Sequence, residues 1–200
     1  LMELASPTKP LLKRLMMEAP GTYHHSLMVG NLAEEAAEAI GANGLLARVG
    51  AYYHDIGKLN RPAFFGENQS SKTGNPHNTM TPQLSATIIT SHTTEGVDLA
   101  KQAKLPPSIR DIIIEHHGTT QVQYFYHKAQ SVSDEPVIEE DYRYSGPKPR
   151  TKESASVMLA DACEATIRSM ETTNIIEIEK TIRKVVKTKR DDGKFDQCDM

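Results

Sequence analysis

Histidine and aspartate side chains, which suit metal binding, stand next to one another at several points of the chain. His54-Asp55 opens the pentapeptide His-Asp-Ile-Gly-Lys, His116 is followed directly by His117, and Asp161 comes later. Imidazole and carboxylate groups are ligands of divalent transition metals, and pairs of such metals promote hydrolysis of phosphate esters. A His-Asp dipeptide also arises by chance in many chains, so its meaning depends on the elements that carry it.

Helical spacing separates His25 from its neighbour His24. Residues three or four apart share a helix face, whereas adjacent residues point about 100° apart. From His25 this spacing reaches the apolar residues Met28, Val29, Leu32, Ala36 and Ile40. From His24 it reaches Asn31, Glu35 and Glu38. We therefore predict that His25 points inward, either as a metal ligand or as a hydrogen-bonded core imidazole, and that His24 points to solvent.

The other candidate ligands stand at or near the ends of predicted helices. His54 and Asp55 precede Gly57, which can end a helix, above a strip of small residues that lets another helix approach closely: Ala47, Gly50 and Ala51. His116 follows a run of isoleucines and precedes Gly118. Asp161 lies at the margin of an apolar stripe. A buried carboxylate there needs a partner, which can be a metal ion or a salt bridge.

Apolar residues recur mostly at helical spacing, and strand-like alternation is scarce. We predict an all-α fold in which residues 1–200 form a single domain, a bundle of about 8 to 10 helices. The predicted helices span 8–19, 23–40, 43–56, 82–103 (bent or broken near Ser91-His92), 106–117, 121–130, 152–170 and 174–189. Two long loops, 60–81 and 131–150, are expected near the active site.

Composition narrows the function classes. A net charge of -3 provides no polycationic surface for long nucleic acid, although a small anionic substrate remains possible. The basic run from Lys180 to Arg190, which includes Lys189, is interpreted as a solvated helix face.

Cys163 and Cys198 lack C-x-x-C spacing, which favours a reducing compartment without a thiolate zinc site. No segment resembles a membrane span or signal peptide, and the start at Leu1 suggests a piece of a longer protein.

The order of these residues resembles a known family. His25, then His54-Asp55, then Asp161 is similar to the H…HD…D pattern of the HD superfamily of phosphohydrolases, and His92 with His116-His117 resembles the extra ligands of its two-metal members. Residues 18–26, 54–58, 115–120 and 144–149 resemble, more narrowly, the cytoplasmic HD domain of the seven-transmembrane HD phosphodiesterases of the PgpH type, which hydrolyse cyclic di-AMP. Ser145 stands where this family is expected to have proline.

The resemblance implies a centre with two divalent transition-metal ions. One ion would be held by His25, His54, Asp55 and Asp161, and the other by His92, His116 and His117, with Asp55 as the bridge. Nitrogen and oxygen ligands without thiolate suit iron, which we expect, or manganese as the alternative.

Further residues are assigned to catalysis and substrate binding. Asp55 and Lys58 are the expected catalytic residues, because the ammonium of Lys58 could meet a phosphate oxygen; a solvated lysine after a helix end is the alternative. Tyr142, Arg143 and Lys148 offer an aromatic face and cations for adenine and phosphate. A plain solvated loop is the other interpretation of that segment.

The expected function is a metal-dependent phosphodiesterase that hydrolyses cyclic di-AMP to linear pApA through a metal-bridging hydroxide. The resemblance implies the cytoplasmic domain of a bacterial membrane protein, with membrane contact only through segments outside this chain. Alternatives are hydrolysis of cyclic di-GMP or guanosine tetraphosphate, an HD-fold oxygenase, and a non-catalytic nucleotide sensor. The sequence makes no prediction of the oligomeric state.

Overall fold

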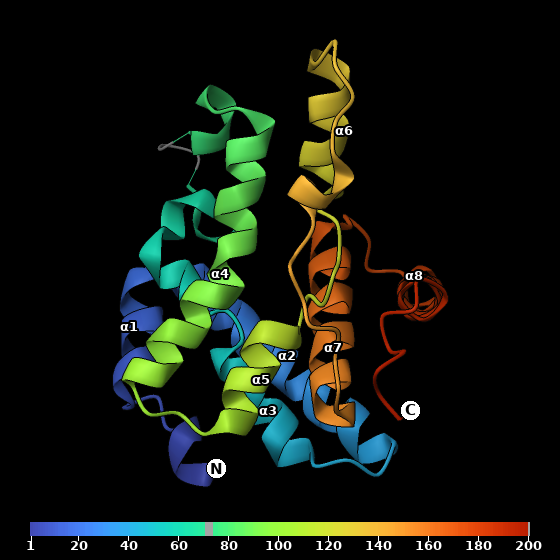
Figure 1. The fold of residues 1–200 in the computed structure, drawn as a ribbon. Coiled ribbons are helices and arrows are strands. Elements are labelled where there is room, and N and C mark those ends of the chain that lie inside the picture. Colours follow the sequence, from blue (N-terminus) through green and yellow to red (C-terminus); the bar gives the residue numbers. More distant parts are fainter. Residues whose placement is uncertain (71–73, 200) are drawn as a thin grey trace.

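The regular structure of the described residues is helical. The computed structural model describes residues 1–70 and 74–199, and within these residues the regular elements are eight α-helices and several short 3-10 turns (Figure 1). The α-helices are α1 (Pro10–Glu18), α2 (Pro20–Ala39), α3 (Gly44–Tyr53), α4 (Pro82–Gln102), α5 (Pro107–Glu115), α6 (Gln123–Val132), α7 (Lys152–Ser169) and α8 (Ile175–Asp191). The all-α prediction is confirmed. In the described part of the chain, no helix is both long and apolar enough to cross a membrane.

Local sequence explains most helix starts. α1, α2, α4 and α5 each begin with proline, whose fixed backbone angle suits the first helical position and whose missing N–H is no loss there. α3, α4, α7 and α8 follow a side chain that accepts a hydrogen bond from a backbone N–H of the first turn, namely Asn43, Thr81, Thr151 and Asn174. These signals place the observed starts within a few residues of the predicted ones.

Most predicted helices differ from the observed ones by up to three residues at an end, and two of the differences affect residues of interest. α4 runs through Ser91-His92 without a break. The hydroxyls of Ser91 and Thr94 donate to the carbonyls of Ile88 and Ser91 in the same helix, so these polar residues are satisfied without disrupting it. The helix predicted for 43–56 ends at Tyr53, and a 3-10 turn, η2 (Ile56–Asn60), follows Asp55.

The buried face of α2 is narrower and composed of smaller residues than predicted. Met28, Leu32 and Ile40 are 43%, 45% and 41% exposed, so assigning them to the inward stripe was wrong. The buried residues in this part of α2 are Ser26, Val29, Gly30, Ala33 and Ala37, of which Val29, Ala33 and Ala37 share a core cluster with residues of α3 and α7. Small side chains let the helix axes approach closely, and the long apolar side chains are left at the solvent edge.

Small residues also bring α3 and η2 close to their neighbours, as the strip beneath His54 predicts. A Cβ at Gly50 would lie 2.4 Å from the side chain of Ile112 in α5. A Cβ at Gly57 would lie 1.8 Å from the carbonyl oxygen of His92 in α4. Glycine at these positions therefore allows the segment that carries His54-Asp55 to lie directly against two other helices.

The C-terminal part is packed less tightly. α6 projects from one end of the bundle beside α4, with its own small core around Phe125 and Ala129 (Figure 1). The strand-like segment after η6 (Glu139–Tyr142) returns along α7 and forms an isolated bridge between Gln121 and Arg143. α8 lies against α7, and none of its residues, all of which are described, is buried.

Candidate metal centre

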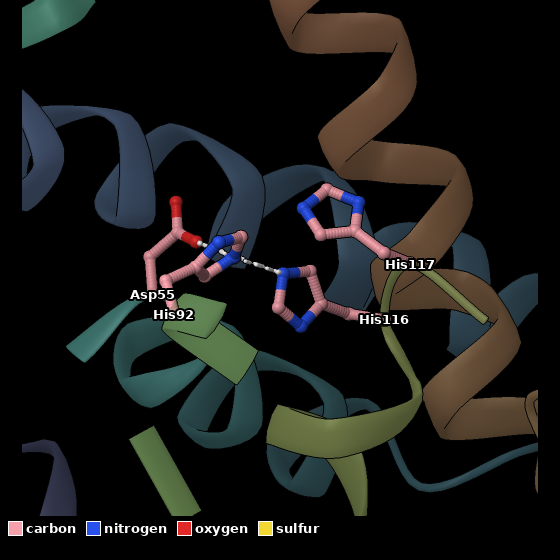
Figure 2. Close-up of side chains that lie close together, drawn as sticks. All are labelled: Asp55, His92, His116 and His117. Carbon is pink, nitrogen blue, oxygen red and sulfur yellow. Dashed lines mark hydrogen bonds and ion pairs between the residues drawn. The ribbon is translucent and has the colours of Figure 1, made fainter. Parts of the chain in front are cut away.

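The seven predicted metal ligands lie in one cluster where five helices meet. His25 comes from α2 and His92 from α4, His54 and His116 follow the last residues of α3 and α5, and Asp161 comes from α7. The ligand atoms form two groups, His25, His54 and Asp161 in one and Asp55, His92, His116 and His117 in the other; within each group they lie within 4.8 Å of one another. Figure 2 shows the four side chains of the second group lying close together.

Asp55 lies between the two groups. Its Oδ1 is 3.1 Å from His92 Nε2 and 3.6 Å from His116 Nε2. Its Oδ2 is 3.2 Å from His54 Nε2 and 3.8 Å from His25 Nε2. Each carboxylate oxygen therefore faces one group, which is the arrangement that a carboxylate bridging two metal ions requires.

The backbone fixes the orientation of three histidines. The Nδ1 of His54, His92 and His116 donates to the carbonyl oxygen three residues earlier in the chain, at 2.6, 2.5 and 2.8 Å. Each imidazole is thereby held with Nε2 facing Asp55 and free to bind a cation. Such hydrogen bonds to the second nitrogen set the tautomer of metal-binding histidines. His117 differs, because its Nδ1 faces Asp161 Oδ2 at 3.7 Å.

His25 is oriented by a carboxylate that sequence analysis missed. His24 is exposed and His25 is buried, as predicted. The Nδ1 of His25 donates to Glu164 Oε2 at 2.5 Å, and its Nε2 is 2.9 Å from Asp161 Oδ1. Glu164 stands three residues after Asp161, on the same face of α7. That spacing is the sequence signal that could have identified it.

The electrostatics of the cluster favour charged carboxylates. Burial opposes ionisation of Asp55 and Asp161, but neighbouring histidines, with Lys58 beside Asp55, hold the pKa of each carboxyl well below its usual range. Burial lowers the pKa of His116 to about 4 and keeps the pKa of His117 well below its usual value. Burial also opposes the charge on His25, yet hydrogen bonds to Asp161 and Glu164 raise its pKa to about 10.

Unsatisfied buried atoms support the metal interpretation. Among the residues that the structure describes, His54 Nε2 and both carboxylate oxygens of Asp55 are buried and make no hydrogen bond of good geometry. A buried polar atom without a hydrogen bond is costly. The ion pairs of Asp55 with Lys58 and His92 offset part of this cost, and metal coordination would satisfy all three atoms. The residues present therefore fit divalent metal ions, although their role as ligands stays a prediction.

Lys58 is held beside Asp55 rather than in solvent. Its Nζ is 2.7 Å from Asp55 Oδ2 and 2.7 Å from Glu67 Oε1, and its side chain is 12% exposed. Glu67, which the sequence did not single out, also accepts a hydrogen bond from the hydroxyl of Thr22 at 3.0 Å. Burial opposes the charge on Lys58, but the two carboxylates raise its pKa above the usual value. The solvated-lysine alternative is therefore wrong.

Tyr142, Arg143 and Lys148, which are predicted to bind substrate, each lie in a different environment. Tyr142 is 5% exposed and packs in the small core of α6. Arg143 donates to the carbonyl of Thr119 and pairs with Glu139. Lys148 pairs with Asp196 at 3.4 Å. Their contact with substrate stays a prediction.

Tyr144 is the tyrosine of this segment that reaches the candidate centre. Its ring stacks on His117 with centroids 4.3 Å apart, and it lies 5.7 Å from the ring of His92. The Tyr-Arg-Tyr pattern could not distinguish Tyr144 from Tyr142, because the direction of each ring depends on how η6 ends.

A cavity of about 810 Å³ opens beside the cluster. His116, His117, Asp161 and Tyr144 line one part of it, and the rest is lined mainly by side chains of α7 and α8 together with residues 120–123. Its volume lies within the range of about 300 to 1,000 Å³ that is typical of small-molecule sites.

Comparison with known proteins agrees with this geometry. A model of the HD domain family matches residues 22–166. Cyclic-di-AMP phosphodiesterase PgpH of Bacillus subtilis is 51% identical over 200 residues, and PgpH of Listeria monocytogenes is 50% identical over 200 residues. This chain is covered completely in both cases but spans only 28% of either relative's length.

Solved structures agree as well. The crystal structure of the L. monocytogenes PgpH HD domain is 50% identical, with a TM-score of 0.89, covering 96% of this chain and 89% of the other. Its complex with cyclic-di-AMP gives a TM-score of 0.92 at 50% identity, covering 98% and 91% of the two chains. The residues matched by the family model extend from α2 to α7 and include all seven candidate ligands. The chain therefore belongs to the HD domain family.

Proposed function

We propose that this chain is a metal-dependent phosphodiesterase that hydrolyses cyclic di-AMP to linear pApA. The observation that carries the proposal is the cluster of seven histidine and aspartate side chains in two groups, with the Asp55 carboxylate between them. The relatives named cyclic-di-AMP phosphodiesterase support the choice of substrate, as does the related HD domain that binds this nucleotide.

The proposed cofactor is a pair of iron ions, with manganese as the alternative. His25, His54, Asp55 and Asp161 would hold one ion, and His92, His116, His117 and Asp55 the other. The donors are nitrogen and oxygen, a set that suits either metal. When bound, two such ions supply positive charge at the phosphate and make water acidic enough to lose a proton near neutral pH.

The reaction adds the elements of water across one phosphodiester. A new P–O bond forms from water, the bond between phosphorus and the ribose 3′ oxygen breaks, and that oxygen leaves with a proton. The buried ammonium of Lys58 keeps the Asp55 carboxylate charged and oriented. Because the ammonium lies directly beside this carboxylate, it could also donate a hydrogen bond to an oxygen of a phosphate bound there. Glu67 also pairs with the Lys58 ammonium, at 2.7 Å.

The cavity beside the centre accounts for nucleotide binding. Tyr144 provides an aromatic face at its wall, and Met158, Val185 and Ala162 provide apolar surface for an adenine. Stacking and apolar contact of this kind bind bases without selecting strongly among them.

The deciding experiment is a turnover assay with cyclic di-AMP and cyclic di-GMP on protein with quantified metal. We expect multiple turnovers, pApA as the product, two metal ions per chain and a clear preference for cyclic di-AMP. A preference for cyclic di-GMP would contradict the proposal that cyclic di-AMP is the substrate. The absence of turnover by metal-loaded protein would favour the alternative of a non-catalytic nucleotide sensor.

Replacement of the bridging carboxylate tests the site itself. Asp55→Ala should reduce both turnover and metal content to background. Asp98→Ala, which removes an exposed aspartate of α4, is the matched control and should behave like the unmodified protein. Turnover by metal-free Asp55→Ala protein would contradict the proposed centre.

We also propose that residues 1–200 act as one HD phosphohydrolase domain. The two larger core clusters together draw residues from α1, α2, α3, α4, α5 and α7, and helices from both halves of the chain supply the candidate ligands. A single cooperative unfolding transition, observed by both circular dichroism and fluorescence, would support one domain, whereas separate transitions would contradict it.

A further inference from the structure

Two lysines line the cavity on the side formed by α8 and the chain that follows it. Lys189 lies in the last turns of α8, and Lys194 comes just after the helix ends. Both line the cavity that also reaches His117 and Asp161. Lys194 is only 7% exposed, and Lys189 is half-buried. The interpretation of Lys189 as part of a solvated helix face is therefore wrong, because this residue faces α7 across the cavity.

Within residues 1–70 and 74–199, neither amine pairs with a carboxylate. Lys189 Nζ donates to Thr120 Oγ1 at 3.2 Å, and Lys194 Nζ donates to Thr119 Oγ1 at 3.5 Å. No carboxylate of the described residues lies within ion-pair distance of either amine. Lys58, the other buried lysine near the centre, is in contrast paired with both Asp55 and Glu67.

The charges around Lys194 add to this imbalance. Burial lowers the pKa of both side chains, and the pKa of Lys194 is lowered further by the neighbouring charges of Lys189, Arg143 and Lys148. Asp192 acts in the opposite direction on both lysines, and Asp161 does so more strongly on Lys189. At Lys194 the neighbouring cations repel an ammonium that is already partly desolvated, which is costly, and an anion that enters the cavity would offset this cost.

We infer that Lys189 and Lys194, together with the hydroxyls of Thr119 and Thr120, form a phosphate-binding site separate from the metal centre. Two ammonium groups and two hydroxyls provide donors for several phosphate oxygens, and ammonium is an effective point charge for phosphate. This inference rests on the proposed function, because a cyclic dinucleotide carries two phosphodiesters. One would react at the metal centre while this site holds the other.

Steady-state kinetics of the metal-loaded protein test the site. Lys189→Met and Lys194→Met keep the aliphatic stems but remove the charges. Each should raise KM for cyclic di-AMP about tenfold, since each removes a charge-assisted hydrogen bond, whereas kcat should change by less than about threefold. Lys180→Met removes an exposed lysine of α8 that does not line the cavity and is the matched control. Lys189→Arg should restore most of the affinity.

Equilibrium binding separates this inference from the proposed function. The probe is the bis-phosphorothioate analogue of cyclic di-AMP, which resists hydrolysis, titrated into metal-loaded protein. Weaker binding by both Met variants would support the phosphate site even if the unmodified protein had no turnover. If the unmodified protein turns over cyclic di-AMP while both variants keep its KM and its affinity for the analogue, the inference is overturned and the proposed function stands.

Thermal unfolding provides a second test, because a lysine with a merely structural role would not give the result expected here. In phosphate-free buffer Lys194→Met should unfold at a higher temperature than the unmodified protein, because a buried charge without a counter-ion has been removed. Inorganic phosphate should then stabilise the unmodified protein more than the variant. A lower unfolding temperature for Lys194→Met, together with an equal response to phosphate, would overturn the inference.

Discussion

The helices that carry the candidate ligands and the helix that closes the cavity are packed in opposite ways. α2, α3 and α7 meet through fully buried small residues such as Ala33, Ala47 and Ala51, and Gly57 lies against the backbone of α4. α8 contacts α7 without a single buried residue of its own. Metal ligands must be held to within fractions of an ångström, whereas a wall that admits a nucleotide can be packed loosely. The molecule thus combines a rigid centre with a more adaptable wall.

The strongest test of this contrast is a change in the tightest contact. Gly57→Ala would place a Cβ 1.8 Å from the carbonyl oxygen of His92, and backbone atoms on both sides would have to move. We expect a loss of about 3 kcal/mol or more in the free energy of unfolding, together with weaker metal binding, measured by denaturant titration and metal analysis. Gly66→Ala, where nothing lies within 4 Å of the added atom, is the control. Equal stability of the two variants would contradict the close packing.

The second test concerns a group that orients a ligand. Glu164→Gln keeps an acceptor for His25 Nδ1 but removes the negative charge. We expect the affinity for metal to fall about 10- to 100-fold, measured by competition with a chelator. The exposed Glu171, in the linker before α8, should tolerate the same change without effect. Unchanged affinity in Glu164→Gln would mean that His25 does not need this partner.

The third test uses pH. Burial opposes ionisation of Glu67, but the charge of Lys58 lowers its pKa below 4.5. A carboxyl whose pKa is lowered by folding stabilises the protein fully above its unfolded pKa, and this contribution is lost as the pH falls through the folded value. Glu67→Gln should therefore cost about 1 to 3 kcal/mol at pH 7 and progressively less below pH 4.5. Denaturant titrations across pH 3 to 7 measure this, and a constant difference would contradict the pairing.

The smallest effect is expected on the outer face of α8. Ile182 is 39% exposed, so Ile182→Ala should change the free energy of unfolding by no more than about 0.5 kcal/mol. Ile112→Ala, at a site that is 1% exposed in the core beneath the ligands, should cost about 2 to 4 kcal/mol. Similar losses in the two variants, measured by denaturant titration, would remove the contrast between centre and wall.

Sequence patterns could predict much of the rigid part and little of the wall. Prolines and capping side chains predict where helices begin, and helical spacing separates His25 from His24. The same spacing failed for Met28 and Leu32, because hydrophobicity alone does not reveal that close helix contacts select alanine and glycine. The positions of Glu67, Tyr144 and Lys189 depend on where loops and a loosely packed helix come to lie. Local sequence carries no signal for contacts of that kind.

The hydrogen bonds of His54, His92 and His116 to carbonyls of their own preceding turn have a consequence for protein engineering. The acceptor that fixes each imidazole comes with the same helical turn, so the orientation of the ring does not depend on a distant partner. A designer could transfer such a ligand to another helical scaffold as a short, self-contained cassette. His25 could not be moved so simply, because its orienting carboxylate lies on a different helix.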